Sequence, residues 1–216
     1  MKKTLVGLVL VVTILAFGSF AQATLLTFEL DTEFSGATAP AGSAPWLTAT
    51  FDDGDTAGSV RLTMEATNLT GSEFISIWSF NVDDLSGITF SGVDLGDVGP
   101  VGLAIGSDCC KADGDGWFDI EFSFASNDFT AGEQVVVDIF RTGLTAGSFD
   151  LLSAGDGNSP DGLLTAAHIQ GIGPTGANSG WITGDGDGNH VPEPTTMLLL
   201  GSGLIGLGAF GRKLKK

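Results

Sequence analysis

Hydrophobic and polar residues alternate strictly in two segments of this chain. From residue 59 to residue 66 every second side chain is apolar, and the side chains between them are mostly polar or charged. Residues 117–124 repeat the pattern, with phenylalanine or isoleucine at every second position. Successive side chains of an extended chain point to opposite faces, so both segments are predicted to be strands with one buried face.

Seven other apolar segments have the length of a strand. They are residues 25–30, 47–51, 74–82, 87–90, 101–105, 134–141 and 164–171. Clusters of Asp and Gly, such as those at 53–55 and 113–116, separate the segments as turns do. Between the two ends of the chain, helix is indicated only as a short turn within 145–153. Nine short strands predict an all-β fold, a single antiparallel, jelly-roll-like β-sandwich over residues 24–181.

The N-terminal residues have the organisation of a secretory signal peptide. Lys2 and Lys3 precede an apolar segment at 5–17, and Ala21-Gln22-Ala23 is a small-residue cleavage site. We therefore expect residues 1–23 to direct the chain to the Sec export machinery and the mature chain to begin at Thr24. The alternative is an N-terminal membrane helix that is retained.

The chain ends in three successive parts. They are the motif Val191-Pro192-Glu193-Pro194, the uncharged segment 195–211 and the basic segment 212–216. The 17 uncharged residues predict a short transmembrane helix of roughly 25 Å, at the lower limit for a ~30 Å hydrocarbon core. The basic segment should stay in the cytoplasm, which places the rest of the chain outside. The alternative is a plain C-terminal anchor.

In this order and position, the three parts resemble the PEP-CTERM sorting signal of bacterial surface proteins, which exosortase enzymes recognise and process. The resemblance implies exosortase as a partner, a transient anchor in the inner membrane, and display at the cell surface or release from it. Segments of the body at 44–51, 73–81, 113–120 and 166–172 are similar to segments of other PEP-CTERM cargo proteins. That group supplies no activity to carry over, but its association with exopolysaccharide-producing bacteria implies polysaccharide as a further partner.

The expected mature chain is strongly acidic. Residues 24–192 contain three basic and 25 acidic side chains, a formal charge of −22. Such a surface repels nucleic acid and anionic lipid, so no nucleic-acid partner is expected, whereas cations are attracted. Residues 182–190, rich in Asp and Gly, are predicted to be a flexible linker before the sorting segment.

The acidic residues suggest one candidate metal site. Asp113, Asp115 and Asp119 stand at alternate or nearby positions, and such carboxylates can converge on Ca²⁺, which binds six to eight oxygens. The EF-hand pattern is not met, because Phe118 stands at the sixth position, where Gly is required. The alternative is a polar Asp-Gly hairpin turn without metal. Calcium is thus the one cofactor to consider.

The only two cysteines, Cys109 and Cys110, are adjacent, and export would bring them into an oxidising compartment. A disulfide between them is favoured over two free thiols or intermolecular bridges. It would stiffen the chain before Asp113.

The four tryptophans and fifteen phenylalanines indicate a large apolar core. Trp46 follows Pro45 and Trp181 follows Gly180, so both are expected near strand ends. They are the candidates for exposed rings that stack on sugars.

Catalytic residues are not indicated. The only histidines are His168, inside an apolar segment, and His190, beside the sorting motif, and no G-x-S-x-G element is present. We therefore expect no enzyme, no catalytic residues and no cofactor-binding residues. The function expected is a non-enzymatic structural or adhesive protein of the cell surface or extracellular matrix, associated with polysaccharide. The alternative is a calcium-dependent carbohydrate-binding or glycan-hydrolysing module.

Overall fold

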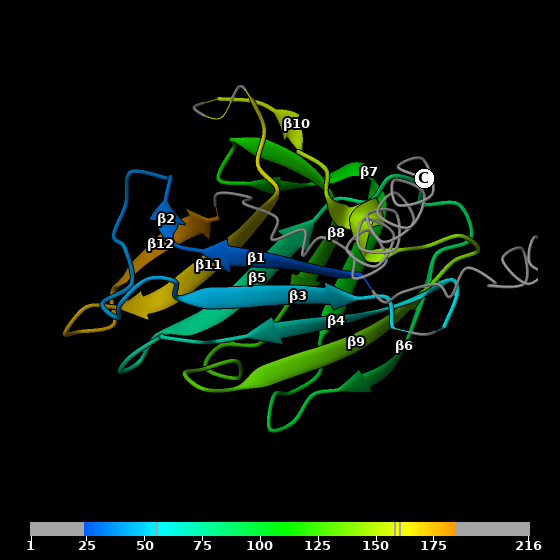
Figure 1. Ribbon diagram of the computed structural model, residues 1–216. Helices are drawn as coiled ribbons and strands as arrows, with labels where there is room; N and C mark the ends of the chain where they lie inside the picture. The colour runs from blue at the N-terminus through cyan, green and yellow to red at the C-terminus, as the bar shows by residue number, and fades with distance from the viewer. Residues whose placement is uncertain (1–23, 55, 158, 160, 185–216) are drawn as a thin grey trace, which may run out of the picture.

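The computed structural model describes residues 24–184 except 55, 158 and 160. These residues form two antiparallel sheets, shown in Figure 1. The first sheet has the order β1 (Leu25–Leu30), β3 (Leu47–Asp52), β4 (Ser59–Glu65), β9 (Gln134–Phe140) and β6 (Thr89–Asp94). The second has the order β10 (Ala154–Gly155), β8 (Gly116–Ser123), β5 (Phe74–Phe80), β11 (Thr165–Ile172), β12 (Asn178–Thr183) and β2 (Thr32–Glu33), and β7 (Gly102–Ala112) also pairs with β8. A single-turn 3-10 helix, η1, spans Ala146–Phe149.

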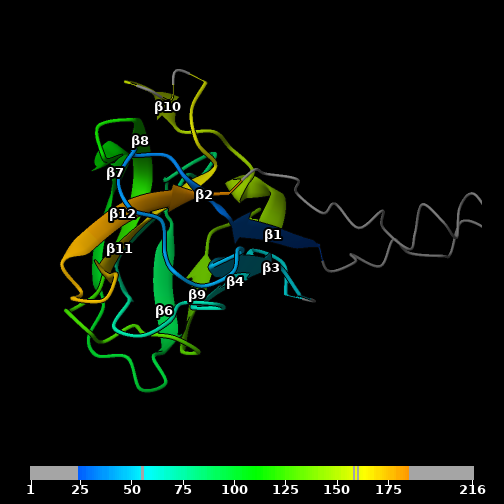
Figure 2. The same ribbon diagram turned by 90° about the vertical axis from the view of Figure 1, so that its left-hand side faces the viewer.

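The two sheets pack face to face, as Figure 2 shows from the side, and enclose the main hydrophobic core. Along β4 and β8 the buried side chains occupy every second position, as the alternation predicts. Phe51 of β3 is fully buried and links the layers, because its ring stacks on Phe149 of η1 at 4.2 Å and meets Phe80 of β5 edge-on at 5.3 Å. Offset and edge-to-face rings of this kind stabilise a core beyond their buried area.

The second sheet curls into a half-barrel. The tip of the β7–β8 hairpin packs against β11, although β5 lies between β8 and β11 in the sheet. A second, smaller cluster fills this curl. It consists of Cys110, Ala112, Phe118 and Ala166, with Phe34, Leu163 and Trp181 packed against it.

The all-β prediction is confirmed, and each of the nine predicted strands is present. The predicted helical turn within 145–153 is η1. Of the predicted jelly-roll-like sandwich, only the arrangement in two layers is observed, because one of the two sheets holds seven strands and curls. Three strands were not predicted. They are β2, β10 and β12.

The domain ends later than predicted. Ile182 is fully buried, and the Thr183 hydroxyl donates to the carbonyl of Thr165 at 2.7 Å, so both residues belong to β12 and not to a linker. The predicted signal peptide, the rest of the linker, the sorting motif, the apolar segment and the basic end lie outside the described residues. Within residues 24–184, no helix is both long and apolar enough to cross a membrane.

Candidate functional site

The candidate calcium residues lie on the β7–β8 hairpin. Asp113 and Gly114 both have positive φ, 46° and 80°, as a tight turn requires, and the Asp115 amide donates to the Ala112 carbonyl at 2.7 Å. The Asp115 side chain is buried, whereas Asp113 is exposed. Desolvation, followed by the charges of Asp115 and Glu33, raises the pKa of Asp113.

The third residue of the set is tied to the backbone. Asp119 Oδ1 accepts the amide of Asp108 at 3.0 Å, and Oδ2 accepts the amide of Val82 at 3.3 Å. Its carboxylate therefore joins β7 to the end of β5. In the part of the chain that the structure describes, no group of three or more His, Cys, Asp or Glu side chains is placed to hold a metal ion. Calcium binding by Asp113, Asp115 and Asp119 stays a prediction.

Cys109 and Cys110 form a disulfide within β7, with an S–S distance of 1.96 Å. The pairing of β7 with β8 shifts register between Ile105 and Cys110, and Asp108, inside this interruption, has a φ of 50°. Cys110 packs into the smaller apolar cluster. The cysteines thus lie on a strand directly before the turn that carries Asp113.

The expectation that Trp46 is exposed is wrong. Its side chain is 8% exposed and packs in the main core, and its indole nitrogen donates to the Gly42 carbonyl at 2.7 Å. Gly42 belongs to the same loop between β2 and β3, and a ring buried to this extent offers no face to a sugar. Trp181 is half-buried, and one face of its ring stacks on His168 with centroids 4.8 Å apart.

His168 is held as a structural residue of β11. The Ser76 hydroxyl lies 2.9 Å from His168 Nδ1 and donates to the His168 carbonyl at 3.2 Å. Burial lowers the pKa of His168, and the charge of Asp113 opposes this shift only in part. The imidazole is therefore neutral at neutral pH, between Ser76 and the Trp181 ring.

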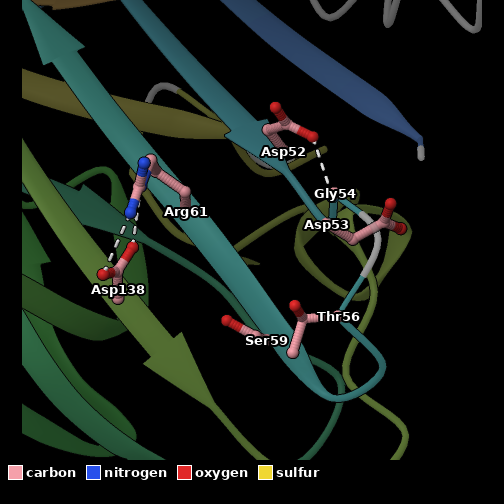
Figure 3. Close-up of a pocket in the computed structure, with 7 residues that line it drawn as sticks. All are labelled: Asp52, Asp53, Gly54, Thr56, Ser59, Arg61 and Asp138. Atoms are coloured by element: carbon pink, nitrogen blue, oxygen red, sulfur yellow. Dashed lines mark hydrogen bonds and ion pairs between the residues drawn. The ribbon is translucent and has the colours of Figure 1, made fainter.

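A polar hollow of about 220 Å³ lies beside the turn between β3 and β4 (Figure 3). It is lined by Asp52, Asp53, Gly54, Thr56, Ser59, Arg61 and Asp138. Arg61 binds Asp138 through two nitrogens, at 2.8 and 3.3 Å, and this hydrogen bonding and charge raise the Arg61 pKa. The hollow is smaller than the roughly 300–1,000 Å³ of ordinary ligand pockets. Its one cation is already paired, which leaves little to recognise an anionic ligand.

The sequence did not reveal this hollow, because Arg61 and Asp138 are 77 residues apart. They meet because β4 pairs with β9 in a register that places them opposite each other. Alternation puts each on the solvent face of its predicted strand, but the order of strands in the sheet is needed to bring them together.

Many carboxylates hold loops by accepting backbone amide hydrogens. Glu73 accepts the amides of Ala41 and Thr70 at 2.7 and 2.8 Å, and Glu33 accepts three successive amides at 35–37. The others that do so are Asp52, Asp53, Asp84, Asp94, Asp119, Glu133 and Asp156. Hydrogen bonds to charged acceptors are roughly twice as strong as neutral ones. Part of the acidic character is thus used to fix loops.

Residues 190–213 match the model of the PEP-CTERM protein-sorting motif. A search of curated proteins and a search of solved structures each returned no match. The matched residues contain the predicted motif at 191–194 and most of the apolar and basic segments after it. The PEP-CTERM motif implies that this chain is an exported protein processed at the membrane by exosortase.

Proposed function

We propose that residues 24–184 form a non-enzymatic structural or adhesive domain, displayed at the cell surface or in the extracellular matrix after exosortase has processed the chain. This proposal rests on one observation: the carboxylates and the histidine that could act in catalysis are bound to other groups of the fold. The carboxylates described above hold loops, and His168 is packed between Ser76 and Trp181. Side chains bound in this way stabilise the fold, and this supports a structural role and not the turnover of a substrate.

The basic residues support the same proposal. Within the described residues, each Lys and Arg forms an ion pair. The pairs are Arg61 with Asp138, Lys111 with Asp156 and Arg141 with Asp83. A domain whose few cations are all paired and whose surface is acidic repels acidic polysaccharides unless cations bridge the two. We therefore propose association with neutral regions of an exopolysaccharide, or with acidic regions through divalent cations.

The test uses mature protein recovered from exosortase-positive cells and exopolysaccharide prepared from the same cells. We expect the protein to sediment with the polysaccharide and to release no new reducing ends or oligosaccharides. A variant that ends at Gly184 shows whether the domain binds without its tail. Turnover of the polysaccharide would contradict the non-enzymatic proposal, and failure of both proteins to sediment would contradict the adhesive one.

A further inference from the structure

Asp53, directly after β3, binds the backbone of Thr24, the first residue that the structure describes. Its Oδ1 accepts the backbone nitrogen of Thr24 at 2.5 Å, and its Oδ2 accepts the amide of Ala146 in η1 at 3.3 Å. The Asp53 amide donates to the Thr24 carbonyl at 3.2 Å. One carboxylate therefore joins the start of β1 to the helical turn. Both the nitrogen and the carbonyl oxygen of Thr24 form hydrogen bonds with Asp53.

The register of the sheet sets this contact. β1 pairs with β3 from Leu25 opposite Asp52 to Leu30 opposite Leu47, and Thr24 with Asp53 continues the pairing by one step. Thr24 also lines a hollow of about 440 Å³, together with Asp53, Gly54, residues 56–58 and residues 142–145. Thr24 thus binds a half-buried carboxylate and borders a hollow that water can enter.

We infer that Asp53 is the binding site for the α-ammonium group that appears when the signal peptide is cut between Ala23 and Thr24. The inference rests on export, which the sorting motif implies, and on the cleavage site predicted from Ala21-Gln22-Ala23.

Cleavage changes the group that faces Asp53. Hydrolysis breaks the bond between the Ala23 carbonyl carbon and the Thr24 nitrogen; water gives its hydroxyl to Ala23 and a proton to the amine, which takes a second proton from solvent. One amide N–H becomes an ammonium with three N–H donors. The bond to Oδ1 becomes an ion pair, and the remaining donors can reach water in the hollow.

The ion pair links stability to pH. A neighbouring carboxylate favours the charged form and so raises the α-amino pKa above its usual range of about 7.7–8.0. A raised pKa means that the contribution is complete below about pH 8 and is lost as the pH rises through the folded value. Processing should therefore make the exported domain more stable at neutral pH than a form in which Thr24 is still an amide.

The test compares two exported proteins made from the full-length chain. One is the natural precursor, and the other has Gly-Ser-Gly inserted between Ala23 and Thr24, so that the ammonium is moved three residues before Thr24 and away from Asp53. Asp53→Asn is made in both, and mass spectrometry establishes each N-terminus. We expect the insertion to lower the thermal midpoint at pH 7 by about 2–4 °C. Asp53→Asn should cost more in the natural protein than in the inserted one, and both differences should disappear near about pH 10.

Equal midpoints, an equal effect of Asp53→Asn in the two proteins, or a mature N-terminus other than Thr24 would overturn the inference. Since Asp53 also binds Ala146, the Asn variant can fail to fold. In that case, the inference is tested by the rate at which the N-terminal amine is acylated at pH 7, compared between the natural and the inserted protein with Asp53 intact. Slower labelling of the natural N-terminus supports the site, and equal rates overturn it. Neither readout depends on matrix binding, so this inference and the proposed function can fail separately.

Discussion

At the scale of single residues, two serines on β5 differ in how their hydroxyls are satisfied. Ser76 bonds to His168, as described above. Ser79 is 1% exposed, and its hydroxyl has no hydrogen-bond partner among the described residues. An unsatisfied buried hydroxyl costs about 1–3 kcal/mol, whereas a formed hydrogen bond contributes about 1 kcal/mol.

Replacing these serines by alanine should therefore act in opposite directions. Ser79→Ala removes the unsatisfied group and is expected to raise the free energy of unfolding by about 1 kcal/mol. Ser76→Ala removes the bonds to His168 and is expected to lower it by a similar amount. Urea denaturation of both variants measures the two changes. A loss of stability in Ser79→Ala would show that its hydroxyl has a partner in solution.

A second residue-scale prediction concerns Glu121, half-buried on β8 opposite Ser79 of β5 and Ala104 of β7. Burial raises the pKa of Glu121, so the fold favours the protonated carboxyl. That contribution is complete below the unfolded pKa of about 4.3 and is lost as the pH rises through the folded value. At pH 7 the ionised side chain is thus a net cost to stability.

Glu121→Gln should relieve this cost. We expect the free energy of unfolding at pH 7 to rise by at most about 1 kcal/mol, because solvent screens the exposed part of the side chain. The gain should shrink toward zero near about pH 3.5, where glutamate is protonated. Glu29→Gln, at an exposed position of β1, controls for the loss of one negative charge from an acidic chain. If both substitutions raise the free energy of unfolding equally at pH 7, the gain comes from the lower net negative charge and not from the burial of Glu121.

At the scale of elements, β12 is a strand because it pairs with its neighbours in the sheet and not because of its own sequence pattern. Residues 178–183 combine polar residues, a glycine and a tryptophan, and they lack the strict alternation of β4 and β8. Pairing with β11, in which Ile182 lies opposite Ala167, brings Ile182 into the core. The strand therefore depends on long-range pairing, which sequence periodicity does not report.

Ile182→Ala tests whether the domain extends past Trp181. Since Ile182 is fully buried, its truncation should lower the free energy of unfolding by about 2–5 kcal/mol. Chemical denaturation measures this loss. If the linker began at residue 182, as predicted from composition, the substitution would change stability by less than about 0.5 kcal/mol.

The difference between local sequence pattern and long-range strand pairing explains which parts of the fold could be predicted. β4 and β8 were located because burial on one face leaves a period of two in the sequence. The Arg61–Asp138 pair needs the order of strands, and the burial of Trp46 needs the path of the loop before β3. Both depend on contacts between residues far apart in the chain, or on a loop conformation, and local pattern contains neither.

At the scale of the whole molecule, sorting information and folding information lie in separate parts of the chain. The domain reaches Thr183, and the match to the PEP-CTERM protein-sorting motif begins at residue 190. The segment between them is short and rich in Asp and Gly. Substitutions in the motif should therefore alter where the protein goes without altering the stability of the domain.

The last prediction concerns the two prolines of the motif. Pro192 and Pro194 fix φ and disfavour helix in the residues before them, which should keep the processing site extended beside the membrane. Replacing both by alanine would let the helix predicted for the apolar segment continue through the motif. We expect the variant to accumulate at full length in the inner membrane of exosortase-positive cells. Fractionation and intact mass measure this outcome.

Pro174→Ala is the matched control, because Pro174 is an exposed proline of the loop between β11 and β12 and lies outside the motif. It should be sorted and processed as the natural chain is. Thermal unfolding of the recovered proteins should show that the double substitution leaves the domain intact. Normal release and normal mass of the double variant would mean that exosortase does not read the prolines. The processing enzyme would then have to recognise the glutamate or the apolar segment instead.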